Sequence, residues 1–258
     1  MIEINNLYKS FGSKKVLDGV SVDIPDGKTI CIIGKSGSGK SVLLKHIVGL
    51  LEPDAGSVFV DGVEVSSMER AQLFEFRRKI GFVFQGAALF DSLTVYENVV
   101  LGLFEHGEHD EEALEKEAIY VLSAVGLLPV PKRGDERFER EWEILRDKKP
   151  ADLSGGMKKR VGVARALVGS PKYILYDEPT TGLDPVTSEQ IDNLIGDLAE
   201  RLNVTSIVIT HDMFSVFRIA HNVAMLHDGK VTFQGTAEAL RASDNPHVKE
   251  FLERYEKD

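Results

Sequence analysis

A short glycine-rich segment near the N-terminus carries residue types that bind phosphate groups. It consists of Gly34, Lys35, Ser36, Gly37, Ser38, Gly39, Lys40 and Ser41. Glycines lack a Cβ, so successive backbone N–H groups can turn toward an anion. The Lys40 ammonium supplies positive charge to the outer phosphates of a nucleotide, and the Ser41 hydroxyl is a suitable ligand for Mg²⁺. This spacing predicts a site for a nucleoside triphosphate and Mg²⁺.

The flanking residues predict the strand and the helix that such a segment requires. Residues 29–33 form an apolar, β-prone run, and residues 42–48 are compatible with a helix that stops at Gly49. A helix N-terminus adds positive potential beside the bound anion. A chance loop rich in glycine, serine and lysine is the alternative, and the strand–helix context argues against it.

A second apolar run ends in two carboxylates. Residues 173–176 precede Asp177 and Glu178. A strand end in a nucleotide-binding sheet points toward the phosphates. Asp177 is placed to hold Mg²⁺ through water, and Glu178 is placed to orient or deprotonate the attacking water. Alone, this pair could be a solvated turn before Pro179; together with the phosphate segment it predicts hydrolysis.

Strands and helices alternate in a way that predicts an α/β fold with a largely parallel sheet and a helical insertion. Turn signals such as Asp61-Gly62 and Asp228-Gly229 separate strand candidates, and Thr94 with Glu97 forms a capping box before a helical stretch. We predict one domain over 1–258. Its parts are a nucleotide-binding core (1–85 and 170–243), a helical subdomain (86–169) and an amphipathic tail (244–258).

Composition excludes several classes of protein. The chain has 258 residues, of which 43% are hydrophobic and 28% charged, and no apolar run approaches the length of a membrane span. The N-terminus shows no signal-peptide pattern. The single cysteine, Cys31, excludes an intrachain disulfide and is expected to be a buried thiol. A net charge of −10 argues against nucleic-acid binding, so we expect no nucleic-acid partner.

Several further motifs follow one another along the chain. Ser154 precedes two glycines and is a plausible helix N-cap. The whole chain from about residue 2 to 240 resembles the ATP-binding cassette (ABC) ATPases. The matching positions are Phe11 (adenine stacking), 34–41 (Walker A), Gln85 (Q-loop), 153–157 (signature motif), 173–178 (Walker B), 182–184 (D-loop) and His211 (switch histidine).

The resemblance implies a fold and a mechanism. The fold is a P-loop NTPase (RecA-like) core with a mostly parallel sheet, an N-terminal antiparallel part and a helical subdomain. Two cassettes pair head to tail, so Ser154, Gly155 and Gly156 of one subunit contact ATP held by the other, with Asp184 at the dimer seam. Glu178, His211 and Lys40 are the implied catalytic residues. Ser41, Gln85 and Asp177 are the implied Mg²⁺ ligands, and Gln85 also senses the transporter.

Within this superfamily, several segments are similar to the Mla/Mce-type lipid-transport ATPases. These are Met157 in the signature motif and the segments 84–95, 177–186 and 245–252. The similarity implies phospholipid transport between envelope membranes, by a homodimer at the cytoplasmic face of the inner membrane. An integral permease is the implied partner, with a Mce-type lipid-binding protein and a small regulatory subunit as candidates. An importer ATPase for a polar solute such as an amino acid, or a non-transport cassette, is the alternative.

Two segments allow two interpretations each. Residues 131–150 are highly charged, but Phe138, Trp142 and Leu145 form a narrow apolar stripe at helical spacing. The segment is either a solvated face or a short helix that packs on the permease or another partner. In the tail, Val248, Phe251, Leu252 and Tyr255 share one helical face. This face packs either on its own subunit or on a partner.

Overall fold

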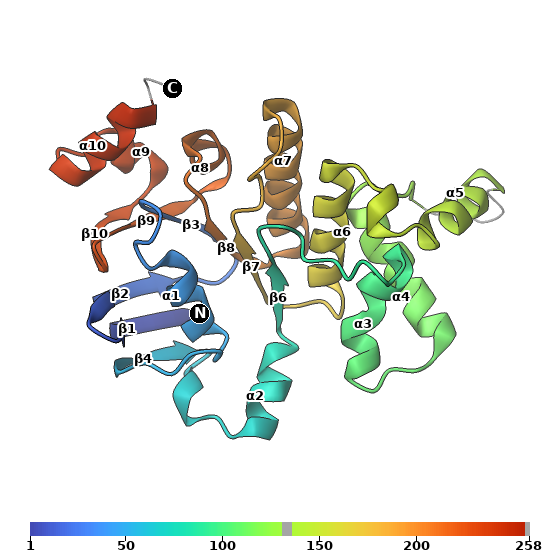
Figure 1. Ribbon diagram of the computed structural model, residues 1–258, viewed down its shortest axis with the longest axis horizontal. Helices are drawn as coiled ribbons and strands as arrows, with labels where there is room; N and C mark the ends of the chain where they lie inside the picture. The colour runs from blue at the N-terminus through green and yellow to red at the C-terminus, as the bar shows by residue number, and fades with distance from the viewer. Residues whose placement is uncertain (131–135, 256–258) are drawn as a thin grey trace. The chain divides into compact units, whose positions relative to one another are not determined.

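A computed structural model of the chain describes residues 1–130 and 136–255, with no side-chain description for residues 254 and 255. The chain forms two compact units (Figure 1). The first contains residues 1–77 and 199–258, and the second contains residues 78–198. Within the described residues, no helix is both long and apolar enough to cross a membrane. The predicted division at residues 85 and 170 follows the motifs and stays a prediction.

The first unit contains two sheets and their covering helices. Its elements are β1 (Ile2–Phe11), β2 (Lys14–Ile24), β3 (Thr29–Ile33), α1 (Lys40–Ile47), β4 (Ala55–Val60), β5 (Val63–Glu64), η1 (Val65–Ser67), α2 (Arg70–Arg77), β8 (Thr205–Ile209), α8 (Met213–Ile219), β9 (Asn222–His227), β10 (Lys230–Gly235), α9 (Ala237–Arg241) and α10 (Pro246–Tyr255). Strands β2, β1, β4 and β5 form an antiparallel sheet. In the other sheet, β3 is parallel to both β8 and β9, and β10 pairs antiparallel with β9.

Burial explains why the sequence indicates these strands. Every residue of β3 and β8 is buried, as expected for parallel strands covered on both faces. The last four residues of β3 are all apolar, whereas β8 begins with Thr205 and Ser206 before three apolar, β-branched residues. Cys31 lies in β3 and is fully buried, as predicted. The two predicted hairpin turns are confirmed, because both central residues of each, Asp61-Gly62 and Asp228-Gly229, have positive φ.

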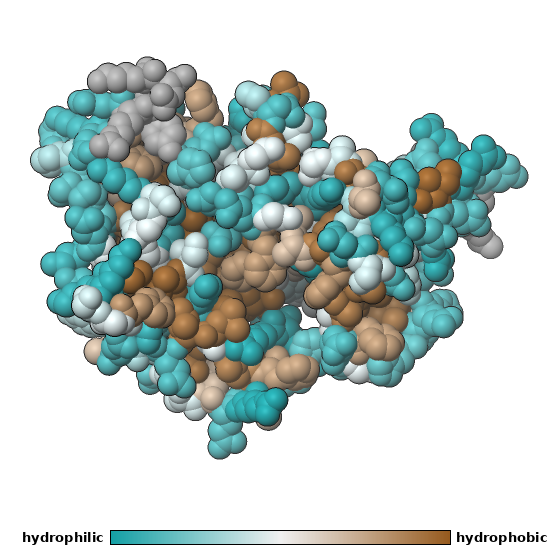
Figure 2. Space-filling model, in the orientation of Figure 1, coloured by the Kyte–Doolittle hydropathy of each residue, from teal (hydrophilic) through white to brown (hydrophobic). Residues whose placement is uncertain are grey.

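The second unit is mainly helical and carries two parallel strands. Its elements are β6 (Ile80–Val83), α3 (Val95–Glu105), α4 (Glu111–Ala124), α5 (Glu136–Arg146), η2 (Pro150–Asp152), α6 (Gly155–Leu167), β7 (Tyr173–Asp177) and most of α7 (Pro185–Leu202). The predicted capping box is confirmed: Thr94 and Glu97 exchange hydrogen bonds at the start of α3. Apolar side chains gather at the surface around α3 (Figure 2). The large apolar side chains that are exposed in this unit include Phe84, Phe90 and Phe104. The α/β fold with parallel strands, an antiparallel N-terminal part and a helical part is confirmed.

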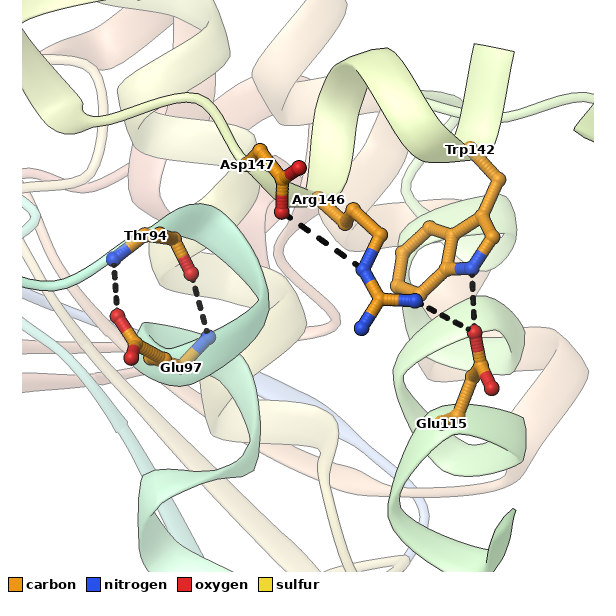
Figure 3. Close-up of polar contacts among 6 residues, drawn as sticks. All are labelled: Thr94, Glu97, Glu115, Trp142, Arg146 and Asp147. Carbon is orange, nitrogen blue, oxygen red and sulfur yellow. Dashed lines mark hydrogen bonds and ion pairs between the residues drawn. The ribbon is translucent and has the colours of Figure 1, made fainter. Parts of the chain in front are cut away.

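Helix α5 resolves the two interpretations of the charged segment, apart from residues 131–135, which lie outside the described residues. Phe138, Trp142 and Leu145 are all buried within the unit. The Trp142 indole N–H donates to Glu115 Oε1 on α4 at 2.7 Å, and Arg146 donates to the same oxygen at 2.9 Å (Figure 3). The Tyr96 ring meets the indole edge-on with centroids 6.0 Å apart. The interpretation as a short helix is therefore confirmed over Glu136–Arg146, but its apolar stripe packs inside its own chain and not on a partner.

We expect Trp142→Ala to destabilise the protein by about 3–5 kcal/mol, because it removes a buried aromatic side chain and leaves a cavity. It also leaves Glu115 without the indole donor. Chemical denaturation monitored by circular dichroism measures the loss. Ile144→Ala is the matched control, since Ile144 lies on the same helix and is 56% exposed. Its expected cost is below about 0.5 kcal/mol. Equal costs for the two variants would contradict the packing described here.

Helix α10 packs on its own unit. Val248 and Phe251 are buried, and Asn245 donates to the Thr232 carbonyl at 2.8 Å. The imidazoles of His227 and His247 stack with centroids 4.1 Å apart. This confirms the interpretation that the tail packs on its own subunit. The predicted contribution of the Tyr255 side chain lies outside the described residues.

Candidate functional site

The predicted phosphate segment lies between β3 and α1, as its sequence context requires. Gly34 and Gly37 have φ values of +147° and +78°, a region that favours glycine. At Gly34, a Cβ would lie 2.2 Å from the Leu226 carbonyl oxygen, so no larger residue fits there. A Cβ at Gly37 would meet no atom of the described residues within 4 Å, so the loop opens to its surroundings at this point. The N-cap residue of α1 is Gly39, which brings no side chain to cap the helix.

Two side chains make this loop suitable for phosphate. Lys40 is buried, and its ammonium donates to the carbonyls of Gly34 at 2.7 Å and Lys35 at 3.1 Å. The Ser38 hydroxyl is buried with no hydrogen-bond partner among the described residues. A phosphate oxygen would give both groups an acceptor in a loop whose helix end favours anions. The residues present therefore fit a nucleotide's phosphates.

Two other predicted residues belong to the same unit. His211 follows β8, whose Ile209 pairs with Ile32 of β3 in a parallel register. The carboxyl ends of neighbouring parallel strands meet at one edge of a sheet, so His211 and the phosphate loop emerge from the same edge. Phe11, at the end of β1, is 49% exposed, and its ring has the surface that adenine stacking needs.

The predicted carboxylates lie at the end of β7 in the second unit, where Asp177 is the last strand residue and Glu178 follows it. Glu178 has a φ of +50°, a strained conformation for a residue with a side chain. Its Oε2 accepts hydrogen bonds from Thr181 Oγ1 at 2.9 Å and from Gln85 Nε2 at 3.3 Å. Gln85 follows β6, which runs parallel to β7. The structure therefore brings together Gln85 and Glu178 at the strand ends, with Asp177 as the last residue of β7.

A separate group in the second unit surrounds the start of α6. Ser154 is the predicted N-cap, and its hydroxyl accepts from the Met157 N–H at 3.3 Å. A Cβ at Gly156 would lie 2.9 Å from the Thr187 methyl group, so glycine allows this close approach. Asp184 accepts from the Thr187 hydroxyl and N–H, and these bonds hold the pKa of Asp184 below its usual range. The signature and D-loop residues are thus neighbours, joined through Thr187.

The predicted Mg²⁺ ligands have the oxygen donors that this ion prefers. Ser41, Gln85 and Asp177 offer hydroxyl, amide and carboxylate oxygens, which are the hard ligands Mg²⁺ prefers. Among residues 1–130 and 136–255 there is no cluster of three His, Cys, Asp or Glu side chains that could hold a metal ion. Mg²⁺ commonly binds with few protein ligands, several waters and substrate phosphates, so the donor type of each of these residues suits it.

Three residues that contact the predicted site were not indicated by the sequence. Thr181 holds Glu178, Thr187 joins Asp184 to Gly156, and the Lys159 ammonium donates to the Gln85 carbonyl. Thr181 and Thr187 follow Glu178 and Asp184 by three residues, a spacing that favours local hydrogen bonds. No sequence signal pointed to Lys159, because its partner lies 74 residues away.

Comparison with known proteins gives consistent matches. The family described as ABC transporter matches residues 17–181. The probable ribonucleotide transport ATP-binding protein mkl of Mycobacterium leprae is 38% identical over 97% of this chain and 68% of its own length. The methionine import ATP-binding protein MetN of Carboxydothermus hydrogenoformans is 40% identical over 98% of this chain and 71% of its own length. Both are therefore longer than the matched part.

A third relative and a solved structure extend these matches. The intermembrane phospholipid transport system ATP-binding protein MlaF of Escherichia coli is 34% identical over 98% of this chain and 88% of its own length. The dimeric, ADP- and phosphate-bound cassette MJ0796 superposes with a TM-score of 0.77 and 35% identity. That match covers 92% of this chain and 99% of the solved one.

Proposed function

This chain belongs to the ABC transporter family and is an ATPase, and from that premise we propose that it powers phospholipid transport between the membranes of a cell envelope. The observation that carries the choice of lipid is the match to MlaF, which extends over 98% of this chain and 88% of that protein. Met157 and the segments 84–95, 177–186 and 245–252 add to it, since they resemble lipid-transport cassettes.

The proposed roles of the site residues follow from their surroundings. Residues 34–41 bind the phosphates of ATP through backbone N–H groups, and Lys40 supplies the charge facing the outer phosphates. Phe11 stacks on adenine. Mg²⁺, held by Ser41, Gln85 and Asp177, would neutralise charge on the phosphates. Glu178 accepts the proton of the attacking water, in an orientation set by Thr181 and Gln85, and His211 maintains the catalytic geometry at the γ-phosphate.

We further propose that the chain acts as a head-to-tail homodimer. Ser154, Asp184 and Val186 are exposed in the single chain, and Val186 is 66% exposed. ATP bound by the partner subunit would cover this surface. Ser154, Gly155 and Gly156 of this chain would then complete the partner's ATP site. The solved cassettes similar to this chain include dimers, which supports the same arrangement.

An integral permease is the proposed membrane partner, bound at the cytoplasmic face of the inner membrane. Phe84 and Phe90 flank the Q-loop and are 45% and 52% exposed, which suits an apolar protein contact. A Mce-type lipid-binding protein and a small regulatory subunit belong to the same proposal. They rest on the resemblance to the lipid-transport group alone.

We expect the tagged chain, purified from detergent-solubilised membranes, to bring with it an integral permease and bound phospholipid. Added MgATP should change the amount of phospholipid retained, measured by mass spectrometry of extracted lipids. Lys40→Ala is the control, because it removes the cation at the phosphates and should abolish the nucleotide response. Cells with this variant should also become sensitive to detergent. Recovery of a polar-solute permease without lipid would contradict lipid transport and leave the ATPase assignment intact.

A polar-solute importer is the second candidate. The relative MetN, named for methionine import, is 40% identical to this chain, and mkl is named for ribonucleotide transport. Uptake of labelled methionine in cells carrying Lys40→Ala separates the candidates. A loss of uptake with unchanged envelope lipid would favour the importer.

A further inference from the structure

Two basic side chains of helix α6 bind backbone carbonyls of the Q-loop, here residues 85–88. Lys159 is buried, and its ammonium donates to the Gln85 carbonyl. Six residues further along the helix, Arg165 donates to the Ala88 carbonyl at 2.8 Å and to the Ala87 carbonyl at 2.7 Å. Between them lies Gly162, where a Cβ would stand only 3.2 Å from the Ala87 Cβ. Helix α6 therefore lies closely against the Q-loop.

The Q-loop segment bound by α6 has an unfavourable backbone conformation. Ala87 and Ala88 are consecutive and have φ values of +60° and +46°. Non-glycine residues rarely adopt this conformation, and it persists only where surrounding contacts stabilise it. The cations of α6 supply such contacts to three carbonyls of this turn.

The same contacts extend to the carboxylate at the end of β7. The Gln85 backbone binds Lys159, and the Gln85 side chain donates to Glu178 at 3.3 Å. Burial lowers the pKa of Lys159, and the negative charge of Glu178 opposes this change. Lys159 lies five residues after Ser154 on one continuous helix. One helix thus joins the signature motif to the Q-loop and, through the Gln85 side chain, to Glu178.

We propose that Lys159 is a positioning residue for ATP hydrolysis, which fixes Gln85 and through it the orientation of Glu178. This inference rests on the proposed role of Glu178 as the base. Because Ser154 begins the same helix, a displacement of the signature motif would move Lys159 and change the Gln85–Glu178 contact. Contact between Ser154 and a partner's nucleotide would then be communicated to the subunit's own carboxylate.

Steady-state ATPase kinetics on the full chain test this role. We expect Lys159→Met to lower kcat by about 10- to 100-fold with little change in the KM for ATP, because misplacement of a catalytic group affects turnover before binding. Lys159→Arg should restore most of kcat, since a guanidinium can donate to the same carbonyl. Arg160→Met is the matched control. Arg160 lies on the same helix and donates to the Val125 carbonyl instead, so its kcat should stay near that of the wild type.

A double-mutant cycle distinguishes positioning from a general loss of structure. Gln85→Ala removes the side chain that joins the Q-loop to Glu178, so adding Lys159→Met should cost little more. Independent, multiplying losses would overturn the proposal, and so would a wild-type kcat in Lys159→Met. The role of Glu178 is tested separately by Glu178→Gln. An inactive Glu178→Gln with a fully active Lys159→Met would refute the positioning role alone.

Discussion

Replacement of Glu178 by glutamine is expected to lower the rate of ATP hydrolysis by about 10²- to 10⁴-fold while ATP affinity is retained, because a positioned general base contributes a factor of this size. Glutamine has the shape of glutamate and can still accept a hydrogen bond from Thr181 and Gln85. It cannot accept a proton from water. ATP should then persist, and the closed dimer should accumulate in size-exclusion chromatography.

Two variants give the comparison for this result. Lys40→Ala should lose nucleotide binding itself, measured with a fluorescent ATP analogue, because it removes the buried cation beside the loop carbonyls. Glu200→Gln changes an exposed glutamate on α7 in the same way and should leave turnover unchanged. Wild-type turnover in Glu178→Gln would show that another group is the base.

Substitution of Ser154 by arginine is expected to abolish nearly all hydrolysis while ATP binding to the monomer stays largely intact. The new side chain is bulky and projects from the exposed start of α6, where a γ-phosphate must approach. Ser154→Thr is the control, because threonine also accepts the helix-capping bond that Met157 donates. It should keep most of the activity, which separates loss of the cap from obstruction of the site.

Mixing two inactive variants tests whether each site is shared between subunits. A dimer of one Ser154→Arg chain and one Glu178→Gln chain has one site with both defects and one site with neither, if the sites form in trans. Random pairing should therefore restore up to about a quarter of wild-type activity, because half of the dimers are mixed and each has one intact site. An inactive mixture, with mixed dimers verified by mass spectrometry, would indicate sites formed within one chain.

The residue types of the site were predictable because its chemistry depends on short segments. Glycines that turn N–H groups toward an anion, a lysine beside them and carboxylates at a strand end must each occupy a fixed place in a local element. The loop between β3 and α1, the strand end at Asp177 and the N-cap at Ser154 are where the sequence predicts them. The apolar run of β3 likewise identifies a parallel strand buried on both faces.

The tertiary structure alone decided which surfaces these elements contact. Helical spacing showed that α5 has an apolar stripe, but the stripe binds α4 through Trp142 and Glu115, which are 27 residues apart. The same holds for Lys159 and Gln85, 74 residues apart, and for Lys35 and Glu250, which join the phosphate loop to α10 across 215 residues. Periodicity and capping act over a few residues, so they determine which face of a helix is apolar. The element that this face contacts depends on how the whole chain packs. The hydrophobic effect is non-directional, so the burial of apolar surface is favourable against any apolar neighbour.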